Sequence, residues 1–114
     1  MMVLSRTLLT TAVVLGVAAT VPTSAWAKGD VAAGKAVFLI KCRKCHGDAG
    51  QGNPAMAKML KVEIKHLGTP GIQKKSDEEL KKQSQDGIGK MKPVEGLSPA
   101  DLENVIAFVR TLKQ

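Results

Sequence analysis

The sequence has few of the side chains that usually fill a protein interior. It contains no tyrosine, one tryptophan and two phenylalanines among 114 residues, and only two cysteines and two histidines. A chain of this length is expected to form one domain, and a small single core gives little stability unless something else reinforces it. No internal repeat or low-complexity tract is present. The scarcity of aromatic residues therefore suggests that something other than side chains fills part of the interior.

Charge is missing from most of the N-terminal segment. Between Arg6 and Lys28 there is no charged residue, and this stretch ends in the small-residue motif AWA at 25–27. A basic start, an apolar stretch and an A-x-A site are typical of a cleaved secretory signal peptide. The alternative is an uncleaved membrane anchor, but the apolar stretch 8–19 is shorter than the roughly 20 residues that a spanning helix needs. We therefore expect cleavage after residue 27.

The remaining segment, residues 28–114, is expected to be the exported domain. Export through a cleaved signal peptide predicts a periplasmic protein without a membrane span in the mature chain. The whole chain has a net charge of +7, so its surface suits an acidic partner. Basic charge without a nucleic-acid-reading motif is weak evidence for nucleic acid, and export argues against it.

Both cysteines and one histidine lie within five positions, as Cys42-x-x-Cys45-His46. In an exported chain this pattern is the attachment motif of a c-type haem. Two thiols three residues apart on a helical turn lie on one side of the backbone and can each add to one vinyl group of the porphyrin. The next residue is then carried under the ring centre, where the neutral imidazole of His46 can ligate iron.

Other uses of the same motif are a disulfide, a redox pair or part of a zinc site. An oxidising compartment permits a disulfide between Cys42 and Cys45, but a thioredoxin-like pair requires a βαβ context, and the rest of the chain shows helical patterns. Zinc needs further ligands, and only His66 remains. Haem attachment is the interpretation that agrees with export, small size and few aromatic residues.

A haem with one histidine ligand leaves the opposite face of the iron open. Methionine is the usual second ligand of an electron carrier, and the candidates are Met91, Met56, Met59 and the histidine His66. Met56 and Met59 are spaced as one apolar face of a helix, so we expect them to fill the core. Met91 lies in a loop punctuated by glycine and proline, without a helical period. We therefore expect Met91 to be the distal ligand.

Three segments have the start signals and periodicity of helices. The first begins after Asp30 and runs into the haem motif, and it contains Gly34 where close contact with another helix would explain the missing side chain. The last has Ser98 as N-cap, proline at its first position and Asp101 in capping-box position, followed by one continuous apolar face. A third helix between Ser76 and a stopping glycine has a poor apolar face.

The segments GKAVF, CRKCH, GKMKP and LSPADLENVIAFVRTL, in this order, resemble those of class I cytochromes c, in particular small bacterial members with one haem. The resemblance covers residues 28–114. It implies an all-α fold of three to five helices around one covalently attached haem, with Cys42, Cys45 and His46 as attachment residues and Met91 as distal ligand. It also implies that a proline carbonyl accepts the N–H of the proximal imidazole, and Pro54 is the candidate.

The same resemblance implies that the N-terminal and C-terminal helices cross. Gly34 and Phe38 would then meet the last helix near Phe108. The sequence departs from many relatives at the distal loop, where Lys92 separates the candidate ligand from Pro93.

We expect an electron carrier that passes single electrons through a haem with His46 and Met91 ligands in a respiratory or related chain. Basic residues beside the haem motif suggest transient, salt-sensitive docking to acidic redox proteins, and we expect a monomer. The alternative is a gas-binding or sensing haem module with a displaceable methionine. A small peroxidase would need acid–base residues near the iron, which the distal loop does not offer, so we do not expect an enzyme.

Overall fold

The computed structural model describes residue 12, residues 16–18 and residues 29–114. The predicted signal peptide and its cleavage site lie outside the described residues, apart from residue 12 and residues 16–18. The helices of the described part are α1 (Val31–Lys41), α2 (Arg43–His46), α3 (Pro54–Leu60), α4 (Pro70–Gln73), α5 (Asp77–Asp86) and α6 (Pro99–Thr111). None of them is long and apolar enough to cross a membrane.

The all-α prediction is confirmed. Within residues 29–114 the β pairing consists of one isolated antiparallel bridge, between Ile88 and Met91. The described part contains six helices, more than the expected three to five. The difference comes from α2 and α4, single turns of four residues that are too short to show a periodic apolar face in the sequence.

Helix α1 begins where the sequence predicts. The side chain of Asp30 accepts a hydrogen bond from the N–H of Ala33 at 2.9 Å, which satisfies one of the free donors of the first turn. Gly34 and Phe38 are the buried residues of this helix, and Phe38 is only 1% exposed. They lie one turn apart, so they form the face that α1 turns toward its neighbour.

That neighbour is α6, the longest helix. Ser98 accepts a bond from the N–H of Asp101, and the Asp101 carboxylate accepts one from the N–H of Ser98, so the predicted capping box is present. The buried residues of α6 are Leu102, Val105, Ile106, Phe108 and Val109. The rings of Phe38 and Phe108 lie 5.1 Å apart at 59°, so the predicted crossing of the first and last helices is confirmed.

Helix α5 buries only Leu80, as its sequence suggests. Polar contacts attach it to α6 instead. The Lys81 ammonium bonds the carboxylate of Glu103 on α6, and the Arg110 guanidinium bonds the carboxylate of Asp77 at 2.7 Å. Ion pairs at a partly exposed surface are weak, so α5 is held less firmly than α1.

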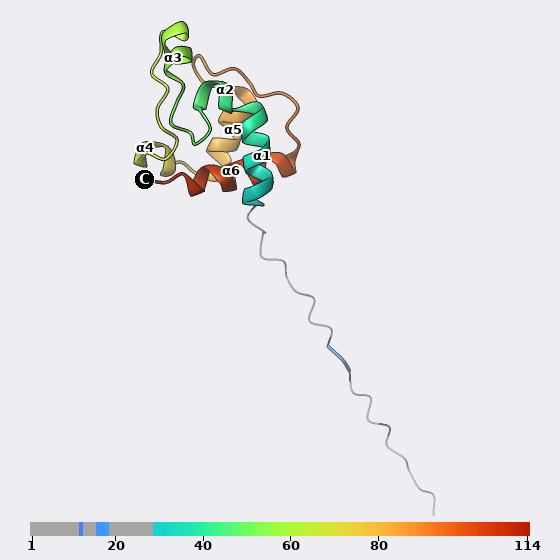
Figure 1. The fold of residues 1–114 in the computed structure, drawn as a ribbon. Helices are drawn as coiled ribbons and strands as arrows, with labels where there is room; N and C mark the ends of the chain where they lie inside the picture. The colour runs from blue at the N-terminus through green and yellow to red at the C-terminus, as the bar shows by residue number, and fades with distance from the viewer. Residues whose placement is uncertain (1–11, 13–15, 19–28) are drawn as a thin grey trace, which may run out of the picture.

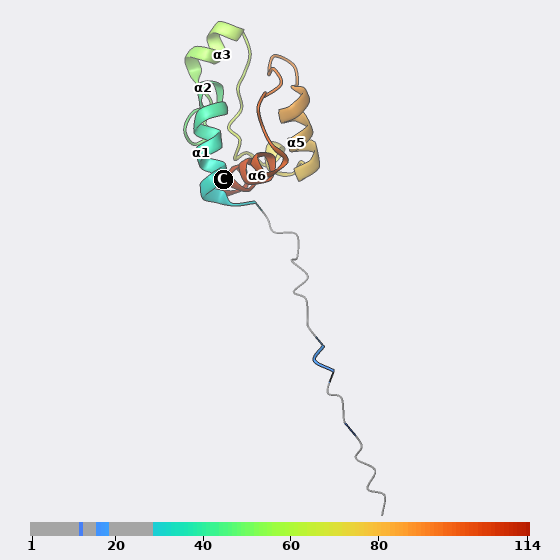
Figure 2. The same ribbon diagram turned by 90° about the vertical axis from the view of Figure 1, so that its right-hand side faces the viewer.

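The helices are arranged around α6 as a base (Figure 1). After a quarter turn, α1, α2 and α3 lie on one side, and α5 with the segment that follows it lies on the other (Figure 2). The haem motif, at the junction of α1 and α2, and the segment after α5 thus come from opposite sides of the molecule.

Candidate haem site

Cys42 lies at the junction between α1 and α2. Its N–H donates to the Phe38 carbonyl at 2.8 Å and ends α1, and its carbonyl accepts the N–H of His46 at 3.0 Å in the next turn. The two cysteines and the histidine therefore share a single helical turn, α2, that is fixed to the crossing of α1 and α6. This is the local geometry on which the sequence interpretation depends.

The imidazole of His46 is partly buried, and its Nδ1 atom is shielded from solvent. Its Nδ1 atom is the only buried side-chain nitrogen or oxygen in the described part of the chain that has no hydrogen-bond partner. Burial also lowers the pKa of His46, because removal from water disfavours the imidazolium. The ring is therefore neutral at pH 7, which is the form that ligates a metal.

The two cysteine thiols are free rather than joined in a disulfide. Burial, with a smaller contribution from Cys45, raises the pKa of Cys42 to about 11. Reactive redox cysteines have lowered pKa values, so a protonated, half-buried Cys42 does not suit a thioredoxin-like pair. Among the described residues, no three His, Cys, Asp or Glu side chains gather as a zinc site requires.

The segment after α2 folds back over the haem motif. The N–H of Gly52 donates to the His46 carbonyl at 2.7 Å, and the N–H of Asn53 donates to the Cys45 carbonyl at 2.9 Å. The Asn53 side chain also donates to the Lys44 carbonyl at 2.9 Å. These bonds satisfy the carbonyls at the end of α2, which a four-residue helix cannot satisfy internally.

Pro54 does not make the contact expected of it in this structure. The Nδ1 atom of His46 has no hydrogen-bond partner, so the expected bond to the Pro54 carbonyl is not formed. Pro54 is instead the first residue of α3, where Asn53 caps the helix. A carbonyl at this position points along the helix toward the N–H groups of the following turn, which explains why it does not reach the imidazole.

Met91 lies in a tight turn after α5. The N–H of Ile88 donates to the Met91 carbonyl and the N–H of Met91 donates to the Ile88 carbonyl, both at 2.9 Å. Met91 is half-buried, while its neighbours Lys90 and Lys92 are exposed. The turn therefore places a half-buried methionine between two exposed lysines.

The other candidate distal ligands are placed less favourably. The Nδ1 atom of His66 accepts a hydrogen bond from the N–H of Gly68 at 2.8 Å, which fixes that ring within its own loop. Met59 is 65% exposed, so the expectation that it fills the core is wrong. It lies on the solvent side of the short helix α3, whose other methionine, Met56, is half-buried.

Two contacts that sequence analysis did not predict hold the Met91 turn in place. The Ser84 carbonyl on α5 accepts the N–H of Val94 at 2.9 Å. Gly87 ends α5 with a φ of 78° and lies against the backbone of Met91 and Pro93. The glycine at the end of the predicted helix was visible in the sequence, but its contact with the ligand segment depends on the tertiary fold.

The residues at this turn fit a haem c. A partly buried, neutral imidazole with an unpartnered nitrogen and two free thiols share one turn. A half-buried methionine lies in a turn on the segment that approaches from the other side. Haem c uses these donor types: two thiols for attachment, imidazole and thioether for the iron.

Comparison with known proteins agrees with this fit. Residues 29–109 match the family described as "Cytochrome C oxidase, cbb3-type, subunit III". Cytochrome c-554(547) of Halothiobacillus neapolitanus is 34% identical over 90 residues, which cover 75% of this chain and 99% of that protein. The solved structure of the KustC0563 c-type cytochrome matches with a TM-score of 0.61 at 26% identity, covering 71% of this chain and 98% of that one.

The fold and the motif therefore define a small c-type cytochrome. More particularly, the chain belongs to the cytochrome c family whose model spans residues 29–109. Its cofactor is haem c, an iron porphyrin bound covalently, and the family's activity is electron transfer through that haem.

Proposed function

We propose that the protein is a single-electron carrier whose haem is attached through Cys42 and Cys45 and ligated by His46 and Met91. The observation that carries the proposal is the partly buried imidazole of His46, neutral and with an unpartnered Nδ1 atom, on the same turn as two free thiols. The assignment of Met91 as the distal ligand is supported by its half-buried position in a turn held by two backbone hydrogen bonds.

The residues of the proposed haem site have different roles. When bound, the haem supplies a one-electron exchange between ferric and ferrous iron. The two thioether links would keep the group attached outside the cell membrane. The bond from the Gly52 N–H to the His46 carbonyl would hold the backbone of the proximal ligand in place. A methionine opposite it would exclude small ligands and raise the reduction potential.

The proposal includes no enzymatic step. In the turn that carries Met91, the titratable neighbours are the exposed Lys90 and Lys92. Neither is a group that peroxide chemistry would use as acid and base at the iron. A gas-binding module is the competing function, and it requires a methionine that leaves the iron readily.

We further propose that residues 1–27 are a cleaved signal peptide and that residues 28–114 work in the periplasm. The support is the AWA motif and the family match, which begins at residue 29. Covalent haem attachment suits a compartment from which a lost cofactor cannot be recovered. N-terminal sequencing of the secreted protein tests the boundary: a mature chain that begins at Lys28 is expected, and retention of the first 27 residues contradicts it.

Redox proteins with acidic docking surfaces, in a respiratory or related chain, are the proposed partners. The basic residues beside the haem motif, Lys41, Arg43 and Lys44, are all exposed. Further exposed basic residues add to the positive charge; they are Lys58, Lys61, Lys65, Lys90 and Lys92. We propose that the protein acts as a monomer. Reduction by such a partner is expected to slow as ionic strength rises, and equal rates at low and high salt contradict the proposal.

Optical spectroscopy of protein matured in a host that attaches haem tests the site. A pyridine haemochrome of the thioether-linked type and a weak near-infrared band from sulfur-to-iron ligation are expected. Met91→Ala should abolish that band and lower the reduction potential, whereas Met59→Ala, at an exposed position, should change neither. Rapid binding of carbon monoxide by the reduced wild-type protein would favour the gas-binding module instead.

A further inference from the structure

We infer that the end of α5 positions the distal methionine, with Gly87 as the positioning residue. This inference rests on the proposed ligation of iron by Met91 and adds the residues that set where its thioether stands. The relevant segment, residues 87–94, is fixed to α5 at both ends and carries Met91 between the two attachments.

The first attachment is a close contact between backbones. Gly87 ends α5 by donating its N–H to the Gln83 carbonyl at 2.9 Å. A Cβ atom on Gly87 would stand 2.5 Å from the Met91 carbonyl oxygen and 2.9 Å from the nitrogen of Pro93. Ordinary van der Waals contact begins at 3.4 Å, so any side chain here would have to displace the backbone of the ligand segment itself.

The conformation of Gly87 also excludes other residues. Its φ of 78° and ψ of 168° lie in a region that glycine alone occupies without strain. This conformation turns the chain at the end of α5 so that Ile88 and Met91 can exchange their two backbone hydrogen bonds. The tight turn that carries the thioether thus begins at Gly87.

The second attachment fixes the far end of the segment. The N–H of Val94 donates to the Ser84 carbonyl at 2.9 Å, one turn before Gly87 on the same helix. Between the two attachments, Lys92 and Pro93 are exposed. The segment that carries Met91 is therefore fixed to α5 through Gly87 at one end and through Val94 at the other, with the extra Lys92 between them.

The test compares three glycine-to-alanine variants of the haem-loaded protein. Gly87→Ala should reduce or abolish the near-infrared band and should bind added imidazole about tenfold to hundredfold more tightly than wild type, because the overpacked methionine competes less well. Gly89→Ala and Gly96→Ala are the controls. Both sites have positive φ, but the space around Gly89 is open and a Cβ on Gly96 would meet only the end of the Lys41 side chain.

The outcomes distinguish failure of the positioning role of Gly87 from failure of the proposed ligation by Met91. If Met91→Ala leaves the near-infrared band unchanged, the proposed ligand is wrong. If Met91→Ala removes the band but Gly87→Ala keeps both the band and the wild-type affinity for imidazole, the positioning role of Gly87 is overturned. Loss of the band to the same degree in Gly89→Ala and Gly96→Ala overturns it as well, because a strained glycine within or after the segment would then suffice.

A measurement on the wild-type protein covers the case in which Gly87→Ala does not fold. When urea or a change of pH removes the near-infrared band, the methionine has left the iron. The backbone amides of Ile88, Met91 and Val94 should begin to exchange with solvent deuterium under the same conditions, because one opening step exposes them and releases the methionine. Exchange of these three amides while the band stays intact overturns the inference.

Discussion

Gly34 of α1 and Asn104 of α6 touch backbone to backbone. The Asn104 carbonyl occupies the space in which a side chain on Gly34 would begin. The contact lies one turn from Phe38, the most deeply buried residue of the core. The two helices can cross this closely only because α1 has no side chain at that point, and the crossing in turn fixes the haem motif at the end of α1.

Gly34→Ala should therefore destabilise the protein. The methyl group forces the helices apart at a cost of about 1–3 kcal/mol, after allowance for the gain of up to about 1 kcal/mol in helix propensity. Urea denaturation of the haem-loaded protein measures the loss. Gly71→Ala in α4 is the control, because no atom lies within 4 Å of the added methyl group. Equal stability of the two variants would contradict the close-contact explanation.

The ends of the long helices could be predicted from the sequence because their signals are local. Asp30, Ser76 and Ser98 cap α1, α5 and α6 through their own side chains, as expected. The four-residue helices were missed because one turn has no periodic pattern. The left-handed conformation of Lys61, with φ of 55°, was also missed, since the residue type gives no sign of it.

The site was predictable to a different degree. Cys42, Cys45 and His46 lie within five residues in a fixed motif, so sequence alone places them on one turn. Their roles, like that of Met91, remain predictions that spectroscopy tests. The hydrogen bond expected between His46 and the Pro54 carbonyl is absent from the structure. Pro54 is the first residue of α3, so its carbonyl points along that helix. Sequence spacing could not anticipate this.

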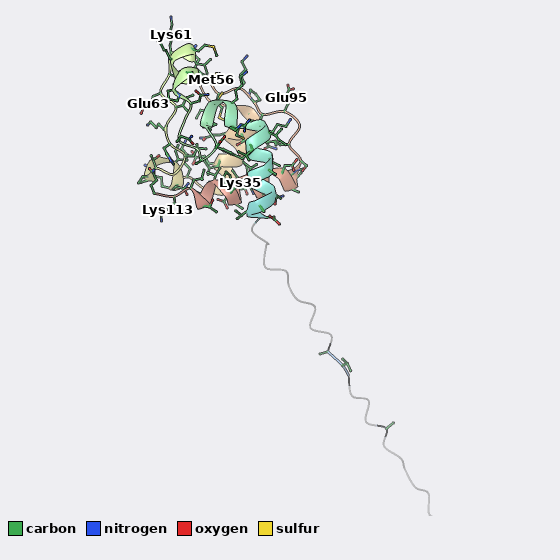
Figure 3. The ribbon with its side chains drawn as sticks, viewed as in Figure 1. Lys35, Met56, Lys61, Glu63, Glu95 and Lys113 are labelled. Carbon is green, nitrogen blue, oxygen red and sulfur yellow. The ribbon has the colours of Figure 1, made fainter. Side chains whose placement is uncertain are left out.

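Lys61→Gly should stabilise the protein. Lys61 ends α3 in the left-handed region, which costs a side-chain-bearing residue roughly 1 kcal/mol more than glycine. The residue lies at the tip of the molecule beyond α3, far from Lys113 near the C-terminus, so little else depends on its side chain (Figure 3). A rise of about 0.5–1 kcal/mol in the free energy of unfolding is expected. Lys65→Gly is the control: the φ of Lys65 is not positive, so glycine there should leave the stability unchanged or lower it. A loss of stability in Lys61→Gly would show that the lysine side chain matters.

Arg110→Lys should loosen α5. The Arg110 guanidinium bonds the Asp77 carboxylate through two nitrogens and also donates to the carbonyls of Gln73 and Lys75. A lysine cannot reproduce this planar set of donors, so a loss of about 1–2 kcal/mol is expected. Arg43→Lys is the control, because its 3.6 Å pair with Asp48 is exposed, and it should change stability by less than about 0.5 kcal/mol. Similar losses in both would remove the special role of Arg110.

The ion pair of Lys81 predicts an alkaline limit to the attachment of α5. Hydrogen bonding to Glu103, and then to Glu78, raises the pKa of Lys81 above its usual 10.5. The pair therefore contributes fully below pH 10.5 and is lost as pH rises through the raised value. Because this is a partly exposed pair, the contribution is at most about 1 kcal/mol. Urea denaturation at pH 9 should show Lys81→Met to be less stable than the Lys82→Met control, and at pH 12 the two variants should be equally stable. The same difference in stability at both pH values would contradict the assignment.

Asn53 has two separable tasks beside the haem motif. Its Oδ1 atom accepts the N–H of Ala55 and caps α3, and its Nδ2 atom donates to the Lys44 carbonyl in α2. Asn53→Ala removes both and should cost about 2 kcal/mol, while Asn53→Asp keeps the cap and should cost about half as much. Ser98→Ala removes a cap of similar strength on α6, away from the haem motif. Because the segment 47–53 supports His46 from behind, both Asn53 variants should change the reduction potential, whereas Ser98→Ala should change only stability. An unchanged potential in both Asn53 variants would mean that this segment does not hold the proximal ligand.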